Sequence, residues 1–256
     1  IVNDIIATAP AVFKMDTDMK KVFNDAWDSK EVLWARYMEE NTGRAYGEGS
    51  YSQIIIQAGD AWSTANQNNP SSLKSFFPQF DNWINADPRF AQTMGWARAI
   101  SATGILYFCP TKLARQGRAS TDLMNDKFTT YYFRYPELYL MQAELRARTN
   151  QSLANCIEPI NIMRSKRTNP VLQPLPVPAS MDELMEVIFR EYCLELYMEN
   201  GSEWFASLRI KKGTQPILYL MKPDITPVDA NKHCWPIPST ETSTNKMIKS
   251  NPGYDN

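Results

Sequence analysis

Residues 180–213, SMDELMEVIFREYCLELYMENGSEWFASLRIKKG, predict two helices that meet at a sharp turn. Ser180 can accept a hydrogen bond from a free backbone amide of the first turn, and Glu183 can reach back, which together make a capping box. Apolar residues then recur at three- and four-residue spacing, which is typical of a helix with one buried face. These residues are Met181, Leu184, Met185, Ile188, Tyr192 and Leu196. The first helix is therefore predicted over residues 181–198.

The turn that follows is expected at Asn200-Gly201, because both residues tolerate a positive φ. Ser202 can cap a second helix over residues 203–212, which carries Trp204 and Phe205 and ends before Gly213. Two helices joined by so short a connection must pack antiparallel.

Length and composition bound the class of protein. The chain has 256 residues, of which 43% are apolar and 12% aromatic, enough for the core of one large domain or two small ones. A net charge of -1 argues against a general electrostatic surface for nucleic acid or for anionic membranes. No apolar run approaches the roughly 18–20 residues that span a bilayer. Because the sequence opens at Ile1 without a methionine, we expect a processed or trimmed form, from which an address label could have been lost upstream.

The cysteines and the single histidine do not form a metal or redox motif. Cys109, Cys156, Cys193 and Cys234 are far apart in sequence, with no C-x-x-C pair, so we expect ordinary buried thiols. His233 would need distant carboxylates or cysteines to complete a metal site. The sequence therefore predicts no metal and no cofactor.

Elsewhere the chain alternates loops with short regular elements. Residues 30–38 predict a strand with both faces largely covered. Residues 133–149 and 153–166 predict amphipathic helices. Pro136 suits the first turn of the first helix, whereas Pro159 strains the middle of the second. Residues 41–52 and 66–72 are predicted loops, residues 54–56 are at most a short strand, and the three prolines of 174–178 predict an extended lead into Ser180.

Five ordered motifs carry a family resemblance. The central one is Ile188-x-x-Glu191-x-x-x-Glu195-Leu196-x-x-Glu199-x-Gly201, followed by Trp204-Phe205 and Leu208-Arg209. The others are Asp87-Pro88-Arg89, then Arg134-Tyr135-Pro136-Glu137-Leu138 with Ala143-Glu144, then Ile160-Asn161-x-Met163-Arg164, and finally Pro236-Ile237-Pro238-x-x-Glu241 with Asn251-Pro252-Gly253-Tyr254. In this order they resemble the SusD/RagB family of outer-membrane nutrient-binding lipoproteins. The chain departs from that pattern at Tyr192 and Cys193, where the family usually has arginines, and at Ala206, where it usually has aspartate.

The resemblance implies a mostly α fold of tetratricopeptide-like helix pairs, a SusD-like α-α superhelix with irregular loops and a few short strands. The pairs would be residues 138–149 with 153–166, and 181–198 with 203–212. Whole members are about twice as long and begin with a lipidated cysteine, so residues 1–256 are expected to be one region that lacks the N-terminal half. Within it, residues 1–130 would be loop-rich with short strands, and residues 131–256 would hold the helix pairs and an extended C-terminal tail.

The resemblance also implies a function. Such a protein would sit on the cell-surface face of the outer membrane through a lipid anchor, capture a glycan or oligosaccharide, and deliver it to a SusC-like TonB-dependent transporter. A RagB-like binder of peptides and a protein-binding scaffold are the alternatives of the binding class.

Catalysis is a further alternative. Glu191 and Glu195 are four residues apart and would share one helix face, so a carboxylate pair for glycoside hydrolysis can be drawn. The stronger interpretation is that they pair with arginines of the neighbouring helices, such as Arg164 and Arg167. No G-x-S-x-G, H-E-x-x-H or phosphate-binding glycine-rich loop occurs, which favours a protein that is not an enzyme.

Aromatic residues in irregular segments are the predicted ligand site. Trp62, Trp83 and Trp96 lie in or beside polar loops rich in asparagine and glutamine, and a flat ring with amide neighbours suits the apolar face and hydroxyls of a sugar. The apolar faces of the helix pairs from Leu138 onward are expected to pack against one another, which leaves little aromatic surface for a sugar. We therefore expect the ligand contacts in residues 43–128, although the three tryptophans could equally be core residues.

Overall fold

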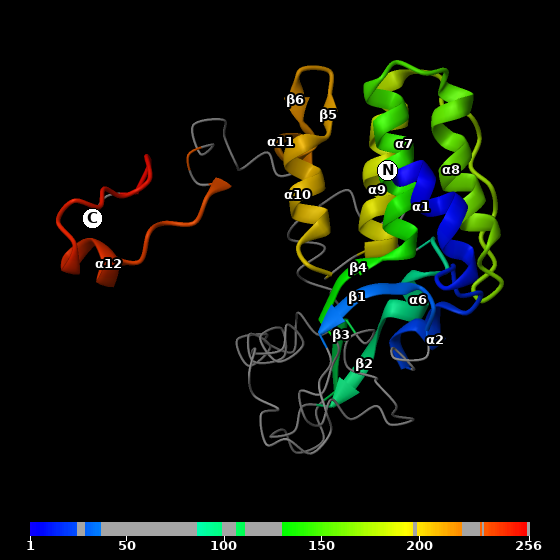
Figure 1. Cartoon of the computed structure of the whole chain (residues 1–256), viewed down its shortest axis with the longest axis horizontal. Coiled ribbons are helices and arrows are strands. Elements are labelled where there is room, and N and C mark those ends of the chain that lie inside the picture. Colours follow the sequence, from blue (N-terminus) through cyan, green and yellow to red (C-terminus); the bar gives the residue numbers. More distant parts are fainter. Residues whose placement is uncertain are drawn as a thin grey trace.

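The computed structural model describes residues 1–24, 29–36, 86–98, 106–110, 130–196, 199–221, 231 and 233–254. Its centre is a group of helices: α7 (Tyr135–Arg148), α8 (Leu153–Ser165), α9 (Met181–Leu196) and α10 (Ser202–Arg209). Figure 1 shows α7, α8 and α9 side by side, with α10 next to α9. The mostly helical class predicted from the sequence is confirmed, and so is each of the two helix pairs.

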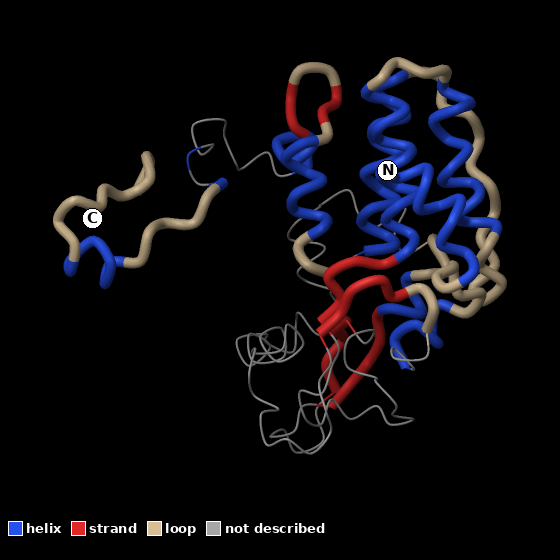
Figure 2. Tube along the Cα trace, in the orientation of Figure 1, coloured by secondary structure: helices blue, strands red, loops and turns tan. Residues whose placement is uncertain are grey.

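Shorter elements surround this centre. The N-terminal segment forms α1 (Val2–Thr8), the 3-10 helix η1 (Ala9–Ala11) and α2 (Met19–Asn24), and the later short helices are α6 (Phe90–Thr93), α11 (Ile217–Met221) and α12 (Ser239–Thr244). The strands form three antiparallel pairs: β1 (Val32–Arg36) with β4 (Thr130–Arg134), β2 (Met94–Arg98) with β3 (Leu106–Pro110), and β5 (Lys211–Lys212) with β6 (Gln215–Pro216). Figure 2 shows the larger strand pairs gathered at one end of the helices. The predicted loops at 41–52 and 66–72 and the short strand at 54–56 lie outside the described residues.

The core lies between the helix pairs. Side chains of α7, α8 and α9 supply most of it, including Leu138, Leu140, Ile160, Ile188 and Phe189, each at most 1% exposed. Apolar burial of this kind stabilises a helix more than its own propensity does. The periodic stripe of α9 is therefore what fixes this helix against its neighbours.

The first turn of α9 is capped as predicted. The amide of Glu183 donates to Ser180 Oγ at 3.2 Å, and the helix begins at Met181. The Glu183 carboxylate reaches back to the amide of Ala179 at 2.8 Å, one residue before the cap residue itself.

The second helix of this pair differs from the prediction at both ends. Its N-cap is Gly201 with a φ of 67°, and Ser202 is already helical and makes no capping bond. The helix ends at Arg209 because Lys211 and Lys212 pair with Pro216 and Gln215 in a hairpin that turns at Gly213. The amide of Gly213 donates to Asp182 at the start of α9, so the two helices run antiparallel as predicted.

The other pair shows how a proline is tolerated. Helix α7 begins at Tyr135, two residues after the predicted start, because Phe133 and Arg134 belong to β4. Pro159 lies inside α8 and cannot donate to the carbonyl of Asn155. That carbonyl instead accepts a hydrogen bond from Arg146 Nη1 at 2.6 Å, so a side chain of α7 replaces the missing backbone donor.

Two further expectations need correction. Trp34 on β1 is 65% exposed, so the predicted strand is not covered on both faces. Cys156 and Cys193 are buried free thiols as predicted, but Cys234 is free and exposed.

The C-terminal segment with α12 lies away from the helix pairs in Figure 1. Two hydrogen bonds join the end of this segment to its beginning: Asn251 donates to the Trp235 carbonyl at 2.7 Å, and Tyr254 donates to the Cys234 carbonyl at 2.8 Å. Among the described residues, no helix is both long and apolar enough to cross a bilayer.

Candidate functional site

The tryptophans predicted to bind ligand are not brought together in the described structure. Trp62 and Trp83 lie outside the described residues, and Trp96 is placed only by its backbone, on β2 opposite Phe108. Their role stays a prediction. Two features of the described residues bear on function, a buried network of ion pairs and an open cavity.

The network occupies the end of the helix pairs next to β1 and β4. Four arginines, Arg89, Arg134, Arg164 and Arg167, face five acids, Asp87, Glu31, Glu191, Glu195 and Glu199, and all nine are buried or nearly so. Arg164 Nη1 lies 2.6 Å from Glu191, and Arg167 Nη2 lies 2.5 Å from Glu195. The predicted pairing of the two glutamates with Arg164 and Arg167 is therefore confirmed.

This pairing makes the network structural. Burial alone would raise the pKa of the Glu195 carboxyl, but the charges of Arg167, Arg134 and Arg89 hold it well below its usual range. A carboxyl that stays ionised and is fully surrounded by arginines cannot give a proton to a leaving group. Glu195 therefore lacks the proton that the general acid of a glycosidase pair supplies.

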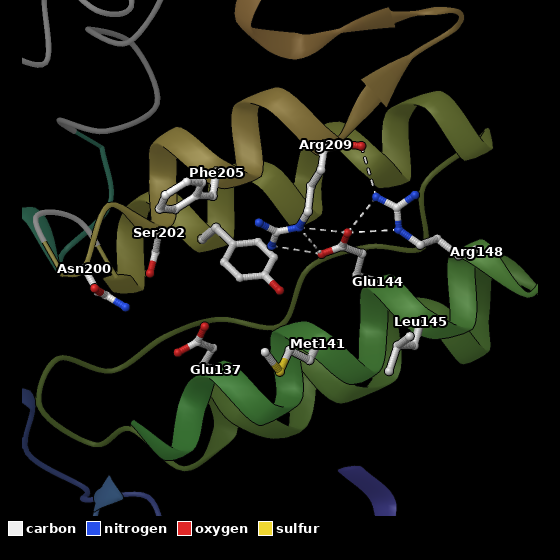
Figure 3. A pocket seen from close by; sticks show the side chains of 10 residues that line it. Glu137, Met141, Glu144, Leu145, Arg148, Asn200, Ser202, Phe205 and Arg209 are labelled. Carbon is white, nitrogen blue, oxygen red and sulfur yellow. Dashed lines mark hydrogen bonds and ion pairs between the residues drawn. The ribbon is translucent and has the colours of Figure 1, made fainter. Parts of the chain in front are cut away.

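The cavity lies between α7 and the α9–α10 turn and has a volume of about 400 Å³. Figure 3 shows Glu137 and Met141 on α7 across the cavity from Ser202 and Phe205 on α10, with Leu145 further along α7. The lining is Glu137, Met141, Glu144, Leu145, Arg148, Tyr192, Asn200, Ser202, Phe205 and Arg209. The volume falls within the range of ordinary small-ligand pockets.

One wall of the cavity is a rigid ion cluster. Glu144 Oε1 accepts from Arg148 Nη2 at 2.7 Å, and Glu144 Oε2 accepts from Arg209 Nη2 at 3.1 Å. The hydrogen bonds and charges of Arg209 and Arg148 outweigh burial and lower the pKa of Glu144, so this carboxylate stays charged. Because both arginines are partly exposed, their remaining N–H groups can face a bound molecule.

Glu137, in the first turn of α7, differs from Glu144 because its pKa is raised and not lowered. Burial and then the charge of Glu199 raise the pKa of Glu137 to about 7, against the smaller opposing effects of Arg134 and Arg209. Near neutral pH a carboxyl of this kind is protonated in part of the molecules and can then donate a hydrogen bond as well as accept one.

Tyr192 on α9 lines the cavity beside Arg209. Its side chain is 1% exposed, and its hydroxyl oxygen has no hydrogen-bond partner among the described residues. The guanidinium carbon of Arg209 lies 4.9 Å from the centre of the ring and holds it in place.

The turn between α9 and α10 completes the site. Asn200 and Ser202 present an amide and a hydroxyl, and Phe205 is 59% exposed beside them. The expectation that the helix pairs leave little aromatic surface is therefore wrong at this point. The Phe205 ring lies beside Gly201, where a Cβ would come within 3.4 Å of it.

Sequence reasoning missed this cavity because its residues come from two helix pairs. The signal that could have found it is the departure at Tyr192, where an aromatic residue replaces a basic one in an otherwise regular motif. Within the described part of the chain, no three histidine, cysteine or acidic side chains are grouped so that they could hold a metal ion.

Comparison with known proteins agrees with the fold. A family model described as the SusD family matches residues 101–254. None of the curated proteins compared with the chain matches it. A SusD superfamily protein from Bacteroides fragilis is 21% identical with a TM-score of 0.67, over 98% of this chain and 57% of that one.

Two further solved structures show the same likeness of fold. NanU of B. fragilis is 16% identical with a TM-score of 0.59, over 100% of this chain and 57% of that one. Surface glycan-binding protein A from Bacteroides uniformis is 16% identical with a TM-score of 0.58, over 98% of this chain and 55% of that one. The chain thus spans a little more than half the length of these solved proteins. Since the family model covers more than half of its residues, the chain belongs to the SusD family.

Proposed function

We propose that the protein is a non-catalytic glycan-binding protein of the cell surface, which captures an oligosaccharide and passes it to a SusC-like TonB-dependent transporter. The observation that carries the proposal is membership of the SusD family. The name of the B. uniformis neighbour, a surface glycan-binding protein, supports the same class of ligand. The family also supports a lipid anchor on the outer face of the outer membrane and a SusC-like partner.

The cavity is the proposed place of sugar contact. Phe205 offers an exposed ring for the apolar face of a pyranose, and Asn200 and Ser202 offer hydrogen bonds to its hydroxyls. Glu137 can serve as donor or acceptor near neutral pH. Trp62, Trp83 and Trp96 are proposed as further contacts from residues 43–128.

The absence of catalysis is part of the proposal. Glycoside hydrolysis needs one carboxylic acid and one free carboxylate beside the scissile bond. Glu191 and Glu195 are both held by buried arginines, and Glu144 in the cavity is held by Arg148 and Arg209.

A calorimetric survey of neutral oligosaccharides tests the proposal. Phe205→Ala and Ser202→Ala should each weaken the bound glycan, by about tenfold for the ring because a stacked aromatic side chain is worth about 1.4 kcal/mol in binding. Trp34→Ala is the matched control, since Trp34 is an equally exposed aromatic residue that does not line the cavity. Alanine at Trp62, Trp83 or Trp96 should weaken the same glycan in at least one case while the protein stays folded.

The survey also separates the alternatives. Release of reducing sugar from any polysaccharide would show a glycoside hydrolase, and binding of peptides without glycans would show a RagB-like peptide binder. No binding of either would indicate a protein-binding scaffold. Normal glycan binding by all five variants would place the site outside both proposed regions.

A further inference from the structure

A second cavity lies on a different face of the helix pairs, where the N-terminal segment crosses the start of α7 and the end of α8. Its volume is about 580 Å³, and it is lined by Pro10, Lys14, Met15, Asp16, Thr17, Lys21, Lys30, Tyr135, Tyr139 and Lys166. Four lysines and one aspartate therefore surround one concave space, in a chain whose net charge is -1.

The four lysines have no acidic partners. Lys14, Lys21, Lys30 and Lys166 are exposed, and none of them forms an ion pair or a side-chain hydrogen bond with the described residues. The nearby acids are engaged elsewhere. Asp16 accepts the hydroxyl of Ser29 at 2.8 Å, and Glu31 is held by Arg167 at 2.6 and 2.8 Å and by Arg134. Of the residues that line the cavity, Asp16 alone carries a carboxylate, so the four lysines leave an excess of positive charge there.

Backbone contacts hold the lysine-bearing segments together. The amide of Lys14 donates to the carbonyl of Lys30 at 3.0 Å. The carbonyl of Thr17 accepts from Thr168 at 2.9 Å, two residues after Lys166, and Arg167 Nη1 donates to the carbonyl of Asp16 at 2.7 Å. The N-terminal segment that carries Lys14, Lys21 and Lys30 is therefore held by hydrogen bonds beside the distant segment that carries Lys166.

The floor of the cavity is aromatic and buried. Tyr135 and Tyr139 are 2% and 6% exposed, with ring centres 5.7 Å apart, and Met15 lies beside them. A cavity walled by low-dielectric groups and lined by one sign of charge concentrates the field and attracts ions of the opposite sign. Several ammonium groups around one concave space suit a ligand that carries carboxylate or sulfate groups.

We propose that this cavity binds an acidic saccharide, a sugar whose carboxylate or sulfate groups are neutralised by Lys14, Lys21, Lys30 and Lys166. The saccharide class rests on the proposed function, whereas the anionic character rests on the lysines alone. The site is separate from the cavity of Phe205 and Tyr192, so the two bind independently.

The experiment compares four probes by calorimetry: trigalacturonate, a sulfated disaccharide, neutral maltotriose and triglutamate. We expect trigalacturonate or the sulfated disaccharide to bind, with affinity that falls as ionic strength rises. The double variant Lys21→Gln/Lys166→Gln should lose about tenfold or more in affinity, because two charge-assisted contacts are removed. Lys20→Gln is the matched control, since Lys20 is an exposed neighbour that does not line the cavity.

Each other outcome overturns the proposal. If neither acidic sugar binds, or if the double variant binds as the wild type does, the cavity is not an anion site. If triglutamate binds as well as the sugars, the saccharide class is wrong. If the neutral glycans of the survey bind but the acidic sugars do not, this inference fails alone; if no sugar of any kind binds, the proposed function fails with it.

Discussion

Arg89 and Glu191 are 102 residues apart in sequence and form a two-pronged ion pair, with Nη1 at 2.9 Å from Oε2 and Nη2 at 3.0 Å from Oε1. The Arg89 side chain is completely buried, and its Nε and Nη2 also donate to Asp87, each at 2.9 Å. The pair attaches the segment of residues 86–93 to the middle of α9. The segment that carries α6 is thereby anchored to the helix pairs through buried charge.

Removal of Arg89 tests this anchoring. Arg89→Met should lower the free energy of unfolding by about 3–5 kcal/mol, because Asp87 and Glu191 would be left buried without their partner. Urea unfolding followed by circular dichroism measures the change. Arg148→Met is the control, since Arg148 is 45% exposed in its ion pair and should cost less than about 1 kcal/mol. Equal effects of the two substitutions would show that the Arg89 pair does not anchor the fold.

The same network predicts sensitivity to acid. Although burial opposes it, bonding to Arg89 lowers the pKa of Asp87 below 3.8, and the nearby arginines lower that of Glu195 below 4.5. In this range the unfolded chain binds more protons than the folded one, so stability is full above about pH 4.5 and falls as the pH drops through the lowered values. Stability measured from pH 6 to pH 2 should be flatter for Glu195→Gln, at a lower level, than for Glu158→Gln, whose carboxyl is 58% exposed. Parallel curves would refute this assignment.

Glu137 predicts the opposite dependence. Its pKa is raised to about 7, so the folded protein binds more protons than the unfolded chain between pH 4.5 and 7, and stability falls as the pH rises through this window. Glu137→Gln should therefore stabilise the protein by about 2 kcal/mol at pH 8 and have little effect at pH 4. Melting temperatures at the two pH values give the answer, with Glu241→Gln on the exposed α12 as the control. A substitution effect independent of pH would show that Glu137 is not raised.

Gly201 predicts a backbone effect at the α9–α10 turn. It has a φ of 67°, and a Cβ there would lie 3.4 Å from Cε2 of Phe205. Gly201→Val should cost more than about 1 kcal/mol, since a β-branched residue is strained at positive φ and would press on this ring. Gly201→Asn keeps the tolerated conformation and should cost less, as Asn200 itself has a φ of 52°. An unchanged melting temperature for the valine variant would contradict the assignment.

The cysteines predict a graded reaction with a thiol reagent. Cys234 is exposed and should react at once in the native protein, whereas burial keeps Cys156 and Cys193 unreactive and raises their pKa values. Denatured protein should show four free thiols, Cys109 included, and Cys234→Ser should lose the rapid phase. Two thiols missing from the denatured count would mean a disulfide that the described residues do not contain.

Local features of the helix pairs could be predicted from the sequence because neighbours along the chain decide them. The Ser180 cap, the apolar stripe of α9 and the positive φ at Gly201 each depend on residues within one or two turns. The predicted end of α10 is three residues too late, because Lys211 and Lys212 pair with Pro216 and Gln215 in a hairpin and these partners lie outside the predicted helix. The predicted burial of Trp34 is also wrong, because the exposure of a strand residue depends on which other elements pack against the strand and not on the pattern of residues within it.

The sequence by itself determined the helical class, the two helix pairs and the family pattern, since these follow from periodicity, capping and ordered motifs. Only the tertiary structure decided which charged residues form ion pairs and where the cavities lie. Arg89 meets Glu191 across 102 residues, and Tyr192 meets Glu137 and Phe205 across a helix pair, so no local pattern contains either set. Ion pairs and cavities arise from distances between elements, and those distances are set by how whole helices pack, after each helix has formed its own local contacts.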